Sequence, residues 1–72
     1  MFNRKKKEFL RIKKEIQLRD GNDDWFFTEL ESIKSSIMTN HGAYYSPRVE
    51  EKNIERLQQL VWWLEDEKKE RR

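Results

Sequence analysis

Residues 46–67 read SPRVEEKNIERLQQLVWWLEDE, the clearest helix signal in this chain of 72 residues. Ser46 is a favoured N-cap residue, and Pro47 fits the first helical position, where its missing N–H costs no hydrogen bond. Apolar residues then recur at spacings of three and four, at Ile54, Leu57, Val61 and Leu64, with Leu60 beside them. Because this spacing places them on one side of a helix, we expect a helix over 47–67 that packs this side into a core.

Two earlier segments show the same helical spacing. The apolar positions are Phe9, Ile12 and Ile16 in residues 3–19, with Phe2 just before them, and Phe26, Leu30, Ile33 and Ile37 in residues 24–39. The intervening DGNDD is typical of a turn, because Gly21 suits the left-handed conformation after a helix. The sequence therefore predicts an all-α fold, a small three-helix bundle with helices at 3–19, 24–39 and 47–67.

The size of the chain allows one domain, 1–72, with a core near the lower limit for independent folding. About a dozen large apolar side chains can face inward, which is little to offset the entropy lost on folding. Homodimerisation through the third helix is therefore one way in which the bundle could be completed. The charged tail at 68–72 has nothing to bury and is expected to fray.

Charge is abundant but unevenly distributed. The chain has 16 Lys and Arg against 14 Asp and Glu, a net charge of +2. Residues 1–19 hold eight cations and two anions, residues 20–45 hold one cation and five anions, and residues 46–72 hold seven of each. A basic first segment could pair with the acidic second segment inside the fold, so it does not by itself imply an external anion.

Features of secreted and membrane proteins are missing from the sequence. The chain has no cysteine, which excludes disulfides and fits a reducing cytosol. The basic start is followed by FLRIK at 9–13, where a signal peptide would have an unbroken apolar run. The longest stretch without Asp, Glu, Lys or Arg, 35–47, is too short and too polar to span a membrane. We expect a cytoplasmic protein with no integral membrane association.

No pattern of catalytic residues is recognisable. The only histidine, His41, has no His, Cys or carboxylate spaced to share a metal with it. The two glycines, Gly21 and Gly42, do not form a phosphate-binding loop, and the serines have no base at a suitable spacing. The sequence predicts a non-enzymatic protein without a metal or cofactor.

Basic residues crowd the first predicted helix: Arg4, Lys5, Lys6, Lys7, Arg11, Lys13 and Lys14. Such cations can neutralise phosphates, so a small DNA- or RNA-binding regulator is an alternative function. These charges lie around most of the helix, and no aromatic residue is placed to stack a base, so a solvated or internally paired surface also explains them. Binding to an anionic membrane surface is a third alternative, but it would take this helix out of the core.

Aromatic residues exceed what one side of the third helix can bury. Successive residues of a helix are about 100° apart, so Trp62 and Trp63 cannot both join the side of Leu57 and Leu64. At least one of these tryptophans is expected to remain partly uncovered, unless other helices or a second copy of the chain cover it. Trp and Tyr are enriched where proteins bind each other tightly.

The leading hypothesis from the sequence is therefore a protein-protein interaction module. It would be a small intracellular regulator or inhibitor that docks an aromatic-rich surface on a larger protein. The predicted partner-binding residues are Trp62, Trp63, Trp25, Tyr44 and Tyr45.

Overall fold

The computed structural model describes residues 2–21 and 24–70, and it is built from helices. Helix α1 covers Phe2–Asp20, α2 covers Asp24–Thr39 and α3 covers Pro47–Glu70. A short 3-10 helix, η1, covers Gly42–Tyr44 between α2 and α3. The predicted all-α fold with three helices is confirmed.

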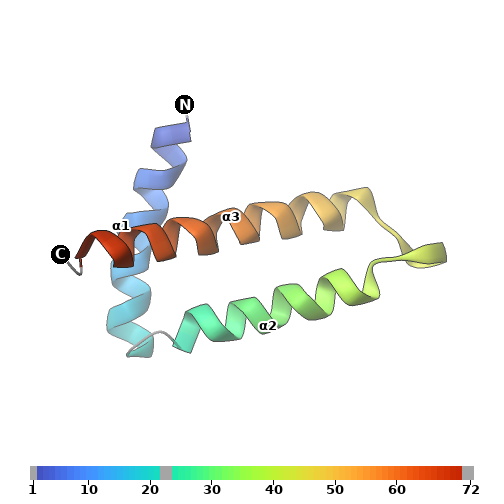
Figure 1. Cartoon of the computed structure of the whole chain (residues 1–72), viewed down its shortest axis with the longest axis horizontal. Coiled ribbons are helices and arrows are strands. Elements are labelled where there is room, and N and C mark those ends of the chain that lie inside the picture. The colour runs from blue at the N-terminus through green and yellow to red at the C-terminus, as the bar shows by residue number, and fades with distance from the viewer. Residues whose placement is uncertain (1, 22–23, 71–72) are drawn as a thin grey trace.

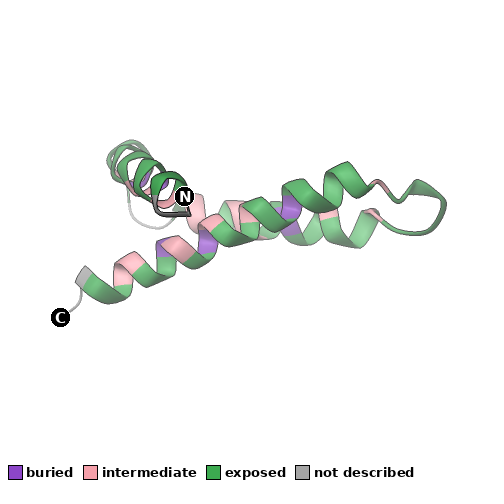
Figure 2. Ribbon diagram, turned by 90° about the horizontal axis from the view of Figure 1, so that it is seen from above, coloured by how far each residue is buried: buried purple, intermediate pink, exposed green. Residues whose placement is uncertain are grey.

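Helices α2 and α3 run antiparallel, side by side, and form a long hairpin with η1 at its tip (Figure 1). Helix α1 crosses behind α3 near the C-terminal end of the chain, at the opposite end of the hairpin from η1. Seen from above, α1 lies on one side of the hairpin and leaves the opposite side uncovered (Figure 2). The molecule is consequently elongated, with principal extents of 45 × 29 × 20 Å.

Local sequence signals explain where the helices begin and end. Gly21 follows α1 with a φ of 76°, the left-handed conformation predicted for it. Ser46 precedes α3, and its hydroxyl accepts a hydrogen bond from the Val49 N–H at 3.4 Å. Asn40, just beyond α2, donates to the Ser46 carbonyl at 3.1 Å and accepts from the Ser46 N–H at 2.7 Å. The two ends of the α2–α3 connection are thereby joined.

The end of α3 differs from the prediction. The helix continues past residue 67 to Glu70, so the frayed tail expected at 68–72 is wrong for 68–70, and 71–72 lie outside the described residues. The physical reason is that Asp66 and Glu67, near this end of the helix, both form ion pairs with Lys13 of α1. These contacts hold the last turns of α3 against α1.

The predicted core side of α3 is wrong for four of its five apolar residues, and Leu60 alone is buried as expected. Ile54, Leu57, Val61 and Leu64 are 38–58% exposed, whereas Asn53, Leu60 and Trp63 are buried. The helix is turned so that the side holding Arg56 faces α2, where the guanidinium binds Glu29 and donates to the Ser32 hydroxyl at 2.8 Å. The buried apolar residues of the described chain are Phe9, Ile16, Ile33, Leu60 and Trp63. The aliphatic row that was expected inside therefore lies on the surface.

Candidate partner-binding site

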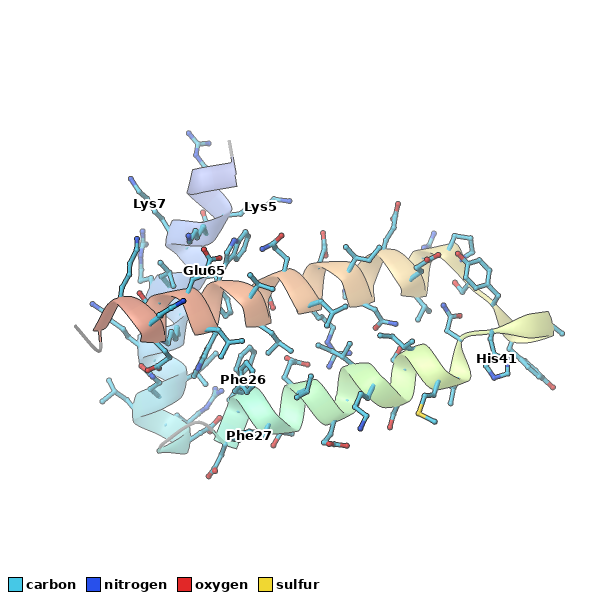
Figure 3. The ribbon with its side chains drawn as sticks, viewed as in Figure 1. Lys5, Lys7, Phe26, Phe27, His41 and Glu65 are labelled. Atoms are coloured by element: carbon cyan, nitrogen blue, oxygen red, sulfur yellow. The ribbon has the colours of Figure 1, made fainter. Side chains whose placement is uncertain are left out.

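Trp63 forms the centre of an aromatic cluster where the three helices meet. Its side chain is 1% exposed and stacks on Trp25 of α2, with ring centroids 4.8 Å apart and planes inclined by 26°. Phe9 of α1 lies 6.4 Å from the Trp63 ring, and Phe26 of α2 lies 6.5 Å from it. Figure 3 shows Phe26 between α2 and α3, near this junction. Trp63 therefore joins the three helices and is not available to a partner.

Trp62 has a different environment from its neighbour. It is half-buried and lies 6.1 Å from the Phe9 ring, so one part of the indole is packed and the rest is accessible. Together with Phe9, Ile12 and Ile54, it lines a groove of about 470 Å³ between α1 and α3. The polar residues that complete the lining are Lys5, Glu8, Glu55, Gln58 and Gln59. The groove thus combines apolar and charged groups, as the middle and rim of protein interfaces do.

Lys13 anchors α1 beside this groove. Its ammonium lies 2.6 Å from the Asp66 carboxylate and 3.0 Å from that of Glu67, and 5.1 Å from the centroid of the Trp63 ring. Gln17, one turn further along α1, donates to Glu67 at 2.8 Å. Burial acts most strongly on Lys13 and lowers its pKa, but the hydrogen bonds and charges of Asp66 and Glu67 together raise that pKa above its ordinary value.

Among the other basic residues of α1, Lys6 pairs with α3, whereas most of the rest are exposed. Lys6 faces Glu65 at 3.8 Å, so the internal partners of the basic helix lie at the end of α3. The acidic segment 20–45, which could have taken that role, contributes no ion pair to α1 across helices among the described residues. Lys5 and Lys7 leave α1 on opposite sides, Lys5 toward the groove and Lys7 away from α3 (Figure 3). Arg4, Arg11 and Lys14 are exposed.

The five aromatic residues predicted to bind a partner do not form one surface. Trp25, Trp62 and Trp63 meet at the α1 end of the hairpin. Tyr44, 85% exposed, belongs to η1 at the other end, and the Tyr45 hydroxyl donates to the Glu50 carboxylate nearby. His41, also exposed, lies beside η1 (Figure 3). Of the five, Trp62 is the one placed in the groove.

Sequence reasoning missed Ile12 and Ile54 as groove residues, because both were assigned to the core. It also missed Lys13 as a buried residue, although a signal existed. Lys13 lies at helical spacing between Phe9 and Ile16, the two buried residues of α1, and the acidic run 65–67 offers it partners. Lysine is almost never fully buried unless it is paired, so a lysine in an apolar row indicates an internal counter-charge, which the acidic run supplies.

Among residues 2–21 and 24–70, no group of three or more His, Cys, Asp or Glu side chains could hold a metal ion. Each helix in the part of the chain that the structure describes is too short or too polar to cross a membrane. Comparisons with protein family models, curated proteins and solved structures found no match.

Proposed function

We propose that this chain is a non-enzymatic interaction module that binds another protein through the groove between α1 and α3. The observation that carries the proposal is the half-buried Trp62, which lines an open groove beside the partly exposed Ile12 and Ile54. An indole fixed on one side and accessible on the other has the properties of an interface anchor, because little further conformational entropy is lost when a partner covers it.

The groove also indicates what the partner presents. A volume of about 470 Å³ accommodates a few apolar side chains, such as those along one side of an amphipathic helix. Lys5 lies on the rim with Glu8 and Glu55, so a partner segment with both charge signs around its apolar residues would find complementary groups. In this proposal the chain regulates or inhibits a larger protein by occupying part of its surface.

The proposal is tested by comparing which proteins the wild-type chain and its variants capture from extract. The wild-type chain, Trp62→Ser and Ile12→Ser are compared as baits in nuclease-treated extract, with Leu18→Ser as the matched control. Leu18 is 87% exposed on α1 and does not line the groove, so its substitution removes a similar apolar side chain elsewhere. A specific partner should be lost with both groove variants and retained with the control.

Circular dichroism of each bait shows whether the fold is retained, and Ile12→Ser serves as the second groove variant because its side chain is half-exposed. If every protein that binds the wild-type chain also binds both groove variants equally, the groove is not the docking site and the proposal is wrong.

A second candidate function, binding to DNA or RNA, is favoured by one observation. Arg4, Lys7, Arg11 and Lys14 are exposed and follow spacings of three and four, so they form one row along α1. Such a row can neutralise phosphates. Its affinity would fall steeply with salt, whereas capture through the groove should depend little on salt.

A further inference from the structure

The uncovered aliphatic row of α3 has the pattern of a helix-pairing surface. Ile54, Leu57, Val61 and Leu64 follow one another at spacings of three, four and three. They correspond to heptad positions a, d, a and d, the apolar repeat by which two helices pack along each other. Glu50 precedes the row and Lys68 follows it, each four residues away and each exposed. We call these six positions the α3 seam.

Neither α1 nor α2 buries the apolar residues of the α3 seam. Helix α3 contacts α2 through Arg56, which binds Glu29, and it contacts α1 through Asp66, which binds Lys13. At about 100° per residue, the centre of the seam lies about 120° around α3 from Arg56 and about 160° from Asp66. The exposure of its apolar members agrees with this placement. The seam is therefore a largely exposed side of α3. Its first half borders the neighbouring helices, because Ile54 lines the groove beside α1, and Glu50, Ile54 and Leu57 line a second pocket with Ile37 of α2.

The whole chain exposes more surface than a monomer of its mass normally does. Its accessible surface is 6314 Å², whereas a folded monomer of 9.0 kDa is expected to expose about 4,900 Å². The radius of gyration, 13.8 Å, likewise exceeds the value of about 11 Å expected for a compact domain of this length. A stable interface of standard size buries about 800 Å² on each partner, so the excess is large enough to supply one.

We propose that the occupant of the α3 seam is a second copy of this chain, with the two α3 helices antiparallel. In that arrangement Ile54 lies opposite Leu64 of the second copy, and Leu57 lies opposite Val61. Glu50 lies opposite Lys68 at each end. All three pairs are symmetric about position 59, so one two-fold axis at that level of α3, on the seam side, satisfies the apolar and the charged pairs together.

The charges at the ends of the seam select the antiparallel direction. A parallel pair of α3 helices would place Glu50 against Glu50 and Lys68 against Lys68, which is unfavourable at both ends. In the antiparallel pair Glu50 faces Lys68 at each end, so both contacts are attractive. It also leaves Trp62 accessible, because Trp62 lies about 120° around α3 from the centre of the seam. Ile54 belongs to both surfaces, so the dimer covers that edge of the groove, whereas Trp62 and Ile12 belong to the groove alone.

A charge swap tests the proposal on the full-length chain. Sedimentation equilibrium over a wide concentration range should show that the wild-type chain dimerises. Glu50→Lys places two cations together at each end of the seam, and Lys68→Glu places two anions together. Each single variant should raise the dimer dissociation constant about tenfold, because attraction becomes repulsion at two symmetric positions. The double variant Glu50→Lys/Lys68→Glu should restore dimerisation to near the wild-type level.

Two controls exclude indirect effects. Tyr45→Phe removes the hydrogen bond to Glu50 without changing its charge and should leave the dimer intact. Val61→Ser places a hydroxyl in the middle of the seam and should favour the monomer, while the helix content by circular dichroism stays unchanged because Val61 is half-exposed. A wild-type chain that is monomeric throughout, or a double variant no better than the single variants, overturns the proposal. Neither result bears on the groove, which is tested by the Trp62 and Ile12 variants.

Discussion

Lys13 is a charged residue whose burial depends entirely on distant partners. Only 1% of its surface is exposed, yet its ammonium has two carboxylates and an aromatic ring around it. A buried ion pair contributes little net stability compared with apolar packing, but removing one member leaves the others without a counter-charge. Asp66 and Glu67 each retain about a fifth of their side-chain exposure, which moderates that penalty.

Lys13→Met should therefore lower the free energy of unfolding at neutral pH by about 1–3 kcal/mol, less than for a fully buried pair. Because its neighbours raise the pKa of Lys13 in the folded state, its contribution is fully present below the ordinary lysine pKa of 10.5 that it has in the unfolded chain. The contribution is lost as the pH rises through the folded-state pKa. The difference between wild type and variant should thus shrink in strongly alkaline solution.

Denaturant unfolding of both chains at neutral and alkaline pH measures this difference. Lys14→Met is the matched control, since Lys14 is the exposed neighbour of Lys13. A control as unstable as Lys13→Met would show that the loss is not specific to the buried ion pairs. A difference that grows with alkaline pH would contradict the direction of the pKa shift.

Among the elements, the α2–α3 connection depends most on one side chain. Asn40 makes two hydrogen bonds with the backbone of Ser46, one as donor and one as acceptor, across six residues of chain. These bonds satisfy polar groups just before α3, while the Ser46 hydroxyl itself caps the helix. The antiparallel arrangement of α2 and α3 is thereby fixed at the tip of the hairpin.

Asn40→Ala should lower the free energy of unfolding by about 1–2 kcal/mol, because the Ser46 N–H loses its partner and the Ser46 carbonyl keeps only the bond from the Glu50 N–H. His41→Ala is the control. His41 is exposed and its side chain makes no capping hydrogen bond, so a change below about 0.5 kcal/mol is expected. Urea titrations monitored by helix content measure both values, and equal losses would show that the Asn40 hydrogen bonds contribute nothing specific.

The elements also show what the sequence can and cannot predict. The turn at Gly21 and the helix start at Ser46 and Pro47 are local signals, and the structure confirms them. The side of α3 that packs inward is not local, because it depends on α1 and α2. Arg56 and Trp63 find partners on those helices, whereas a helical wheel assigns the inward side to Ile54 and Leu57. The ion pairs of Lys13 join residues more than 50 positions apart, beyond the reach of periodicity.

The candidate site was predicted only in outline for the same reason. Adjacent positions in α3 made it certain that Trp62 and Trp63 point in different directions, and Trp62 is indeed the more exposed of the two. Which neighbours complete the groove depends on the crossing of α1 over α3. Ile12 and Ile54 are brought together by that crossing, and no spacing in the sequence relates them.

In the whole molecule, few large apolar residues are buried compared with those that remain exposed. The buried apolar residues lie mainly where α1 crosses the hairpin, and exposed surface extends over most of the remaining ribbon (Figure 2). Ile33 and Leu60 are the buried apolar residues that lie along the hairpin outside the aromatic cluster. The stability of such a chain should depend on what covers the α3 seam.

The melting temperature should therefore rise with protein concentration, because an equilibrium between folded dimer and unfolded monomer shifts toward the dimer by mass action. Calorimetric scans at several concentrations measure this dependence. Val61→Ser should melt at a lower temperature that no longer changes with concentration. A wild-type melting temperature independent of concentration would contradict dimerisation coupled to folding.

The stacking of Trp25 on Trp63 gives the protein an intrinsic optical reporter. Two indoles 4.8 Å apart with planes inclined by 26° couple their excited states, and a chiral arrangement of this kind produces an exciton couplet in circular dichroism. That signal vanishes when the rings separate, even while the peptide backbone remains helical. Loosening of the junction between α2 and α3 can thus be timed separately from the melting of the helices, without any added dye.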